Sequence, residues 1–254
     1  MKASYTRSIR TWPPLACAKL EQRWRPVLKT GNILLMPLRM LNEHAANVER
    51  RNFEEIAERF KDIPESEIID VRPEIGVPIL EKLSATEDPD LRSMFIELLA
   101  SAADKNKVSL AHPSFVRVIE SFSPDEAKII EAWKTSPMPS LMVGLQCDGG
   151  SARLVYDPFV EVPDSVSFPN LASMYVANLA GLGLVVHHNE RYVPDDDAYD
   201  GLIEGVEKEV PGIKEKQISV LGKRNDIVPG DHFYKKGCIQ ITPYGKAFQR
   251  ACLT

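Results

Sequence analysis

Three residues near the middle of the chain carry side chains that could support covalent catalysis. His112 lies two positions before Ser114, and Asp104 lies eight positions before His112. An imidazole beside a hydroxyl can remove its proton and turn the oxygen into a nucleophile, with a carboxylate as third partner. The sequences that usually frame a nucleophilic serine and its oxyanion hole are absent. We therefore favour a structural interpretation, in which Asp104 ends one helix and His112 and Ser114 begin the next by binding free backbone amides.

A second group of candidate ligands is the pair His187 and His188 together with the acidic run 195–197. Adjacent residues on a strand point to opposite faces, so these two imidazoles are poorly placed to chelate one ion. Gly181 and Gly183 do not form a phosphate-binding loop, because they follow a predicted helix and no Gly-Lys-Ser/Thr sequence comes after them. The sequence therefore predicts no metal and no small-molecule cofactor.

The cysteines do not change this conclusion. No two of them are separated by only two residues, so neither a zinc site nor a disulfide framework is indicated. Reduced thiols in a cytoplasmic protein are the expectation. The four cysteines are Cys17, Cys147, Cys238 and Cys252.

Charge is distributed unevenly along the 254 residues, whose net charge is −5. Residues 1–51 hold ten lysines and arginines against three acids, so the remainder of the chain is strongly acidic. A basic arm indicates an anionic partner, either nucleic acid or a membrane surface, although the arm could equally pair with the acidic body. The candidate contacts with an anionic partner are Arg23, Arg25, Lys29, Arg39, Arg50 and Arg51.

An apolar run lies inside this basic arm, at residues 31–41. It is far shorter than the roughly 20 residues that cross a bilayer. With basic neighbours it could lie on an anionic membrane surface, but short runs of this kind more often pack against another helix or a partner. The candidate membrane or partner contacts are Ile33, Leu34, Leu35, Leu38 and Leu41.

The elements that would position these residues are mostly helices. Apolar residues at spacings of three and four, bounded by capping residues, mark each helix. Asp88 before Pro89 and Ser123 before Pro124 are the clearest starts, and Glu126 completes a capping box with Ser123. The predicted helices in this part of the chain cover 41–60, 73–84, 89–104, a short segment after 112–114, and 124–133.

The C-terminal half mixes helices with short strands. The predicted elements are strands at 141–146 and 153–156, a helix at 170–182 capped by Asn170, a hairpin of 184–187 with 190–193, an amphipathic segment within 195–210, a polar loop at 223–237, a strand at 238–241 and a final helix after Thr242. This order indicates a winged-helix-like module. Its second helix, 170–182, contains no Lys, Arg or Gln, so protein contact or internal packing is expected rather than reading of DNA.

The predicted fold class is mainly α with a small β component (α+β), a helical N-terminal region followed by a winged-helix-like C-terminal module. We expect a basic lead-in at 1–30, a helical region at 31–122 and the winged-helix-like module at 123–254. The length allows one large domain or two small ones.

Several segments resemble the abortive infection alpha (Abi-alpha) family of bacteria. They read PEIGVPILEKLS, DPDLRSMFIELLASAADKN, LAHPSFVRVIESFSPDEAKII and ITPYGKAFQRACL, and NILLMPLRMLNEHA extends the likeness back to about Asn32. The resemblance implies a cytoplasmic bacterial protein connected with defence against phage. The basic and apolar arm leaves open a position at the periphery of the inner membrane. It supplies no catalytic residues for this chain.

Three hypotheses for the molecular activity follow. The first is a defence protein that acts without catalysis, by binding a phage protein, a host protein or another copy of itself. The second is a nucleic-acid-binding module that uses the basic arm and the winged-helix-like core. The third is a peripheral membrane effector that works through residues 33–41. The first is favoured because the family likeness comes without a catalytic constellation.

Overall fold

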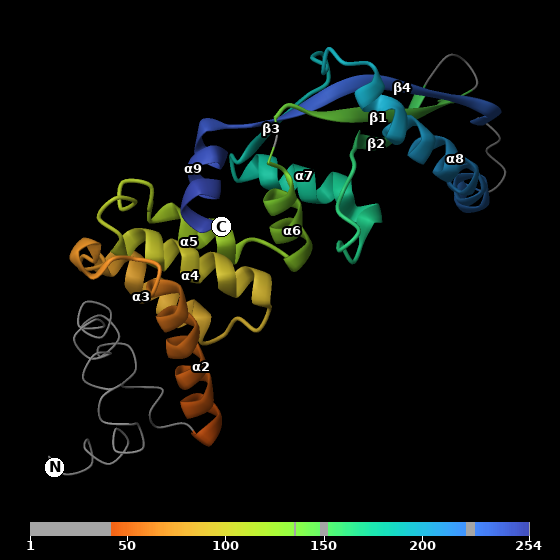
Figure 1. The fold of residues 1–254 in the computed structure, drawn as a ribbon. Helices are drawn as coiled ribbons and strands as arrows, with labels where there is room; N and C mark the ends of the chain where they lie inside the picture. The colour runs from red at the N-terminus through yellow and green to blue at the C-terminus, as the bar shows by residue number, and fades with distance from the viewer. Residues whose placement is uncertain (1–41, 135, 148–151, 222–226, 254) are drawn as a thin grey trace, which may run out of the picture. The chain divides into compact units, whose positions relative to one another are not determined.

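The computed structural model describes residues 42–134, 136–147, 152–221 and 227–253 (Figure 1). The described part is a mixed α+β fold, which confirms the predicted class. Contacts divide the chain into two compact units. The first contains Met1–Ser121 and Arg250–Thr254, and the second contains Phe122–Gln249.

Helices build the first unit around one central, almost fully buried helix, α4. Helix α4 packs against α2, α3 and α5, and its side chains from Met94 to Ala103 are all buried. Apolar side chains from the surrounding helices, such as Phe60, Ile79 and Phe115, are buried in the same unit. The helices of this unit are α2 (Asn42–Phe60), the 3-10 turn η2 (Glu65–Glu67), α3 (Pro73–Leu83), α4 (Pro89–Ala103) and α5 (Ser114–Glu120).

The two predicted helix starts are confirmed by their hydrogen bonds. The Asp88 carboxylate accepts hydrogen bonds from the backbone amides of Asp90 and Leu91, both at 3.1 Å. In the second unit, Ser123 Oγ accepts from the Glu126 amide, while the Glu126 carboxylate accepts from the Ser123 amide at 2.6 Å. These caps satisfy amides that the helices cannot pair internally, so the chain direction at both junctions is set by local chemistry.

The second unit is a four-stranded antiparallel sheet with helices packed on it. The strand order is β2-β1-β4-β3. The elements are α6 (Pro124–Ala132), β1 (Met138–Cys147), β2 (Ala152–Phe159), the 3-10 turn η4 (Pro169–Leu171), α7 (Ala172–Gly181), β3 (Val185–His188), the 3-10 turn η5 (Asp197–Tyr199), α8 (Asp200–Leu221), β4 (Ile227–Ile241) and α9 (Pro243–Cys252).

The sheet is curled, and helices cover it. Asp157 on edge strand β2 and His187 on the opposite edge strand β3 come within 3.7 Å of each other, which requires the two edges to bend together. Alternate residues of β1 from Leu141 to Leu145 pack with Tyr199 and the buried side chains of α8. Helix α7 packs against both edge strands, β2 and β3 (Figure 1). The sheet therefore holds α7 from two sides.

Helix α7 ends where the glycines predicted it would. The Gly183 amide donates to Ala180 O at 2.9 Å, and the Leu184 amide donates to Leu179 O at 3.0 Å. This pair of bonds is a Schellman ending, which needs a left-handed residue at its turn. Gly183 supplies that conformation with a φ of +77°, because it has no side chain to clash.

Three local predictions in the second unit are wrong. Residues 227–237 are not a loop but the first part of β4, because pairing with β1 outweighs the weak strand preference of Pro229, Gly230 and Asp231. Strand β3 pairs with β4 and not with 190–193, so the expected hairpin does not form. Asn170 does not cap α7, whose first residue is Ala172 and whose N-cap is Leu171 without a side-chain hydrogen bond.

A buried carboxylate attaches the start of α7 to α6. Asp125 is 3% exposed and accepts hydrogen bonds from the Ser167 amide at 2.8 Å, the Phe168 amide at 3.0 Å and the Tyr175 hydroxyl at 2.9 Å. Burial alone would raise the pKa of Asp125, but these hydrogen bonds outweigh it and hold the pKa below its usual value. Burial raises the pKa of Tyr175 to about 12, and the hydrogen bond to the Asp125 carboxylate adds to the shift.

Replacing Asp125 therefore makes the stability of the protein less sensitive to acid. At about pH 7 we expect Asp125→Asn to lower the free energy of unfolding by about 2 kcal/mol, since charge-assisted hydrogen bonds are lost. A carboxyl with a lowered pKa stabilises the fold above its unfolded pKa of about 3.9, and this contribution disappears as pH falls through the folded pKa. Urea unfolding of both proteins from about pH 7 to about pH 3 should show the difference narrowing. A difference that stays constant would contradict the assignment.

Candidate interaction surface and charged cleft

The three candidate catalytic residues lie at helix boundaries. His112 Nδ1 lies 2.6 Å from Ser114 Oγ and accepts a hydrogen bond from the Ser114 amide at 3.2 Å. Because Nδ1 accepts from the amide it carries no proton, so the Ser114 hydroxyl donates to it. Asp104 follows the last residue of α4 and accepts from the Asn106 amide at 2.8 Å. Asp104 and His112 thus each bond a nearby backbone amide, as predicted, whereas the Ser114 hydroxyl bonds the His112 ring and does not cap α5. No hydrogen bond within the described ranges joins Asp104 to His112.

Two of the predicted basic contacts, Arg50 and Arg51, lie on exposed turns of α2. Each faces an acid four residues on, with nitrogen–oxygen distances of 4.0 Å to Glu54 and 3.9 Å to Glu55. The remaining predicted contacts lie outside the described residues and stay predictions. They are Arg23, Arg25, Lys29, Arg39, Ile33, Leu34, Leu35, Leu38 and Leu41.

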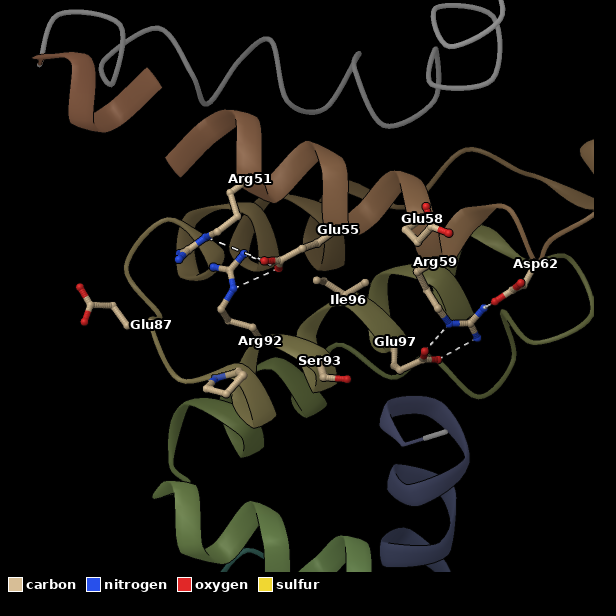
Figure 2. Close-up of a pocket in the computed structure, with 11 residues that line it drawn as sticks. Arg51, Glu55, Glu58, Arg59, Asp62, Glu87, Arg92, Ser93, Ile96 and Glu97 are labelled. Carbon is tan, nitrogen blue, oxygen red and sulfur yellow. Dashed lines mark hydrogen bonds and ion pairs between the residues drawn. The ribbon is translucent and has the colours of Figure 1, made fainter. Parts of the chain in front are cut away.

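A charged cleft of about 580 Å³ opens in the first unit beside α2 and α4 (Figure 2). In Figure 2, Arg51 and Arg92 point toward Glu55. Arg59 points toward Glu97 and Asp62. The partners come from α2, α4 and, for Asp62, the turn that follows α2. The cleft is lined by Arg51, Glu55, Glu58, Arg59, Asp62, Glu87, Pro89, Arg92, Ser93, Ile96 and Glu97.

The guanidinium of Arg92, on α4, connects four segments of the first unit. It donates to Glu55 Oε2 at 2.5 Å and to Asn52 Oδ1 at 2.7 Å on α2. It also donates to Leu83 O at 2.8 Å, a carbonyl at the end of α3, and to Thr86 O at 3.0 Å in the following loop. With a further bond from Nε to Glu55, all five N–H groups of the side chain are used. Arg92 therefore has no donor left for a ligand.

The second arginine of the cleft is engaged in the same way. Arg59 makes a paired hydrogen bond with the buried Glu97, through Nε to Oε1 and through Nη2 to Oε2, and it binds Asp62 at 3.1 Å. The hydrogen bond to Glu97 raises the pKa of Arg59 further above its ordinary value, so the guanidinium remains charged. We conclude that the ion pairs lining the cleft have a structural role and hold α2 and α4 together.

The second unit carries an exposed apolar strip along η4 and α7, which we call the α7 face: Phe168, Leu171, Met174 and Ala177. These residues recur every three positions and so share one side of the turn and helix. Phe168 is 60% exposed and Met174 is 55% exposed, although both are large and apolar. The opposite side of α7, which includes Tyr175, Val176 and Leu179, is buried.

Helix α7 is thus apolar on both its buried and its exposed side. No Asp, Glu, Lys or Arg occurs anywhere from Ser165 to Asn189. A surface helix normally carries polar residues on its outer side, and a contiguous exposed apolar strip marks an interaction site. The sequence prediction had noted the missing basic residues of this helix but not its exposed side. The sequence signal that could have revealed this face is the absence of charged residues around the whole helix. If any side of such a helix is exposed, that side is an uncharged, apolar surface.

Other types of site find no support in the described residues. The parts of the chain that the structure describes contain no group of three or more His, Cys, Asp or Glu side chains placed to hold a metal ion. Within the same residues, every helix is too short or too polar to cross a membrane.

The molecule is thus a two-unit α+β protein whose second unit carries an exposed apolar helix face. The family model described as Abortive infection alpha matches residues 44–252, which is most of the chain. The chain belongs to the abortive infection alpha family. No curated protein and no solved structure matches it significantly.

Removing the side chain of Arg92 should destabilise the first unit strongly. Arg92→Met removes the shorter of the two ion pairs of Glu55 and leaves the carbonyls of Leu83 and Thr86 without this donor, so we expect the free energy of unfolding to fall by about 3 kcal/mol or more. Arg50→Met, at a side chain that is 62% exposed, should lower the free energy of unfolding by less than about 0.5 kcal/mol. Urea unfolding of both variants measures the difference. An equal fall in the free energy of unfolding of the two variants would show that Arg92 does not hold the helices together.

Replacing His112 should affect the helix start and not the biological activity. His112→Ala removes the acceptor for the Ser114 amide and hydroxyl, with an expected loss of about 1 kcal/mol. Phage plaque counts on cells that express the variant should equal those on cells that express the unmodified protein. A folded His112→Ala protein without phage protection would restore the catalytic interpretation of His112 and Ser114.

Proposed function

We propose that the protein protects bacteria against phage by binding another protein through the α7 face, without catalysing a reaction. The family to which the chain belongs is named for abortive infection, which supports the defence role. The observation that carries the mode of action is the exposed apolar α7 face, with Phe168 and Met174 more than half exposed. The partner is a phage protein, a host protein or another copy of this chain.

Energetics support a protein partner. Fully burying a Phe or Met side chain contributes about 1.5–3 kcal/mol, so the exposed parts of Phe168 and Met174 would together contribute on the order of 2–3 kcal/mol on binding. The fixed position of Phe168 also favours binding. Asp125 holds the Phe168 backbone in place, so little conformational entropy is lost on association. A few such anchors, surrounded by weaker contacts, are the usual source of affinity in protein interfaces.

The same chemistry disfavours nucleic acid as the partner of this face. Base edges in the major groove are read mainly by Arg, Lys, Asn and Gln, and phosphates are bound mainly by cations. The α7 face offers none of the cationic side chains. Binding of nucleic acid or an anionic membrane by residues 1–51 is a separate prediction that rests on the charge of that arm.

A charge placed on the α7 face should abolish protection. We expect Met174→Glu to restore phage plaque formation to the level of cells without the protein, because a carboxylate would have to be buried in an apolar contact. The matched control is Leu154→Glu on β2, since Leu154 is 54% exposed and Met174 is 55% exposed. The control should protect as well as the unmodified protein.

Folding must be verified for both variants by thermal unfolding, where we expect changes within about 0.5 kcal/mol for exposed positions. If the folded Met174→Glu protein protects cells fully, the proposed role of the α7 face is wrong.

A further inference from the structure

The loop that leads into the α7 face carries two acids, which we call the acidic border. Glu161 and Asp164, in the loop that leads to Phe168, are both exposed. The nearby cation, Lys128, is already engaged, with Nζ 3.0 Å from Ser165 O and 3.8 Å from the Asp125 carboxylate. A partner that suits this surface must offer apolar side chains next to positive charge and must lack acids.

The chain itself contains a segment of this composition. Residues 23–41 hold four basic residues and no acid, and their apolar run is concentrated at 33–41. The basic residues are Arg23, Arg25, Lys29 and Arg39. These residues lie outside the described structure, so the match concerns their chemistry alone. Apolar side chains in 33–41 suit the α7 face, and the basic residues suit Glu161 and Asp164.

We propose that the α7 face of one copy binds residues 33–41 of a second copy, with Lys29 and Arg39 beside the acidic border. This inference rests on the proposed function and names the partner. An anionic membrane is disfavoured as the occupant, since Glu161 and Asp164 would be repelled by its surface charge.

The proposal has a consequence for assembly. The donor segment and the receiving face are different parts of the chain, so the contact is heterologous. A pair joined by one such contact keeps one unused segment and one unused face. These either bind each other and close a reciprocal dimer or bind further copies, so self-association is expected as protein concentration rises.

Photo-crosslinking of the full chain tests the contact directly. Met174 is replaced by the photoreactive amino acid p-benzoylphenylalanine, which this exposed position should accommodate without unfolding. Protein with natural isotopes and protein labelled with ¹⁵N are mixed in equal amounts, irradiated and digested. Mass spectrometry should find cross-links from position 174 to residues 29–41, including products that join a light and a heavy chain.

Two controls sharpen the result. The same photoreactive amino acid at position 154, which is equally exposed, should give no cross-link to residues 29–41. When the chain also carries Leu35→Glu and Leu38→Glu, the yield of cross-links from position 174 to residues 29–41 should fall by roughly tenfold, since the apolar contact is lost. Arg39→Glu should lower it by a smaller factor, because it removes attraction to the acidic border.

The possible outcomes separate this inference from the proposed function. Cross-links to other regions, cross-links confined to single chains, or none between copies would overturn the self-binding proposal. If Met174→Glu still abolishes phage protection in that case, the α7 face binds a different protein and the proposed function stands. If Met174→Glu leaves protection intact while the cross-links form, the contact exists but does not serve defence.

Discussion

The surface on which this account depends is held in place by one buried carboxylate, that of Asp125. It binds two consecutive backbone amides, at Ser167 and Phe168, and the hydroxyl of Tyr175 on α7. These bonds fix where the chain enters η4 and which side of α7 faces the interior. Tyr175 is directed inward, whereas Met174 and Ala177, which lie about 100° and 160° away from it around the helix, are exposed. An internal polar contact thus determines the placement of an external apolar strip.

Buried charge has a comparable role in the first unit. Arg92 uses all five of its N–H groups to join α2, the end of α3 and the following loop to its own helix, α4. Such interactions add less net stability than an apolar replacement of the same shape often would, but they are costly to break by removing one partner. The cleft that surrounds Arg92 is therefore explained by the packing of helices, and the search for function moves to the second unit.

Local chemistry made part of this structure predictable from the sequence. The helix starts at Asp88 and Ser123 depend on residues within one turn, and both are confirmed. The strand at 227–237 was missed because its stability comes from pairing with β1, roughly ninety residues away along the chain, and not from its own residues. The pairing of β3 was missed for the same reason. Exposure of the α7 face was likewise invisible, because an apolar residue in the sequence does not reveal on which side the sheet lies.

Covalent footprinting in living cells tests the central claim most directly. Hydroxyl radicals generated during phage infection label exposed side chains, and the labelling of Phe168 and Met174 is compared with that of the dilute purified protein. Binding through the α7 face predicts that both become strongly protected in cells, whereas Leu154, with a similar exposed fraction, is labelled to the same extent in both states. Undiminished labelling of Phe168 and Met174 in protected cells would contradict the account.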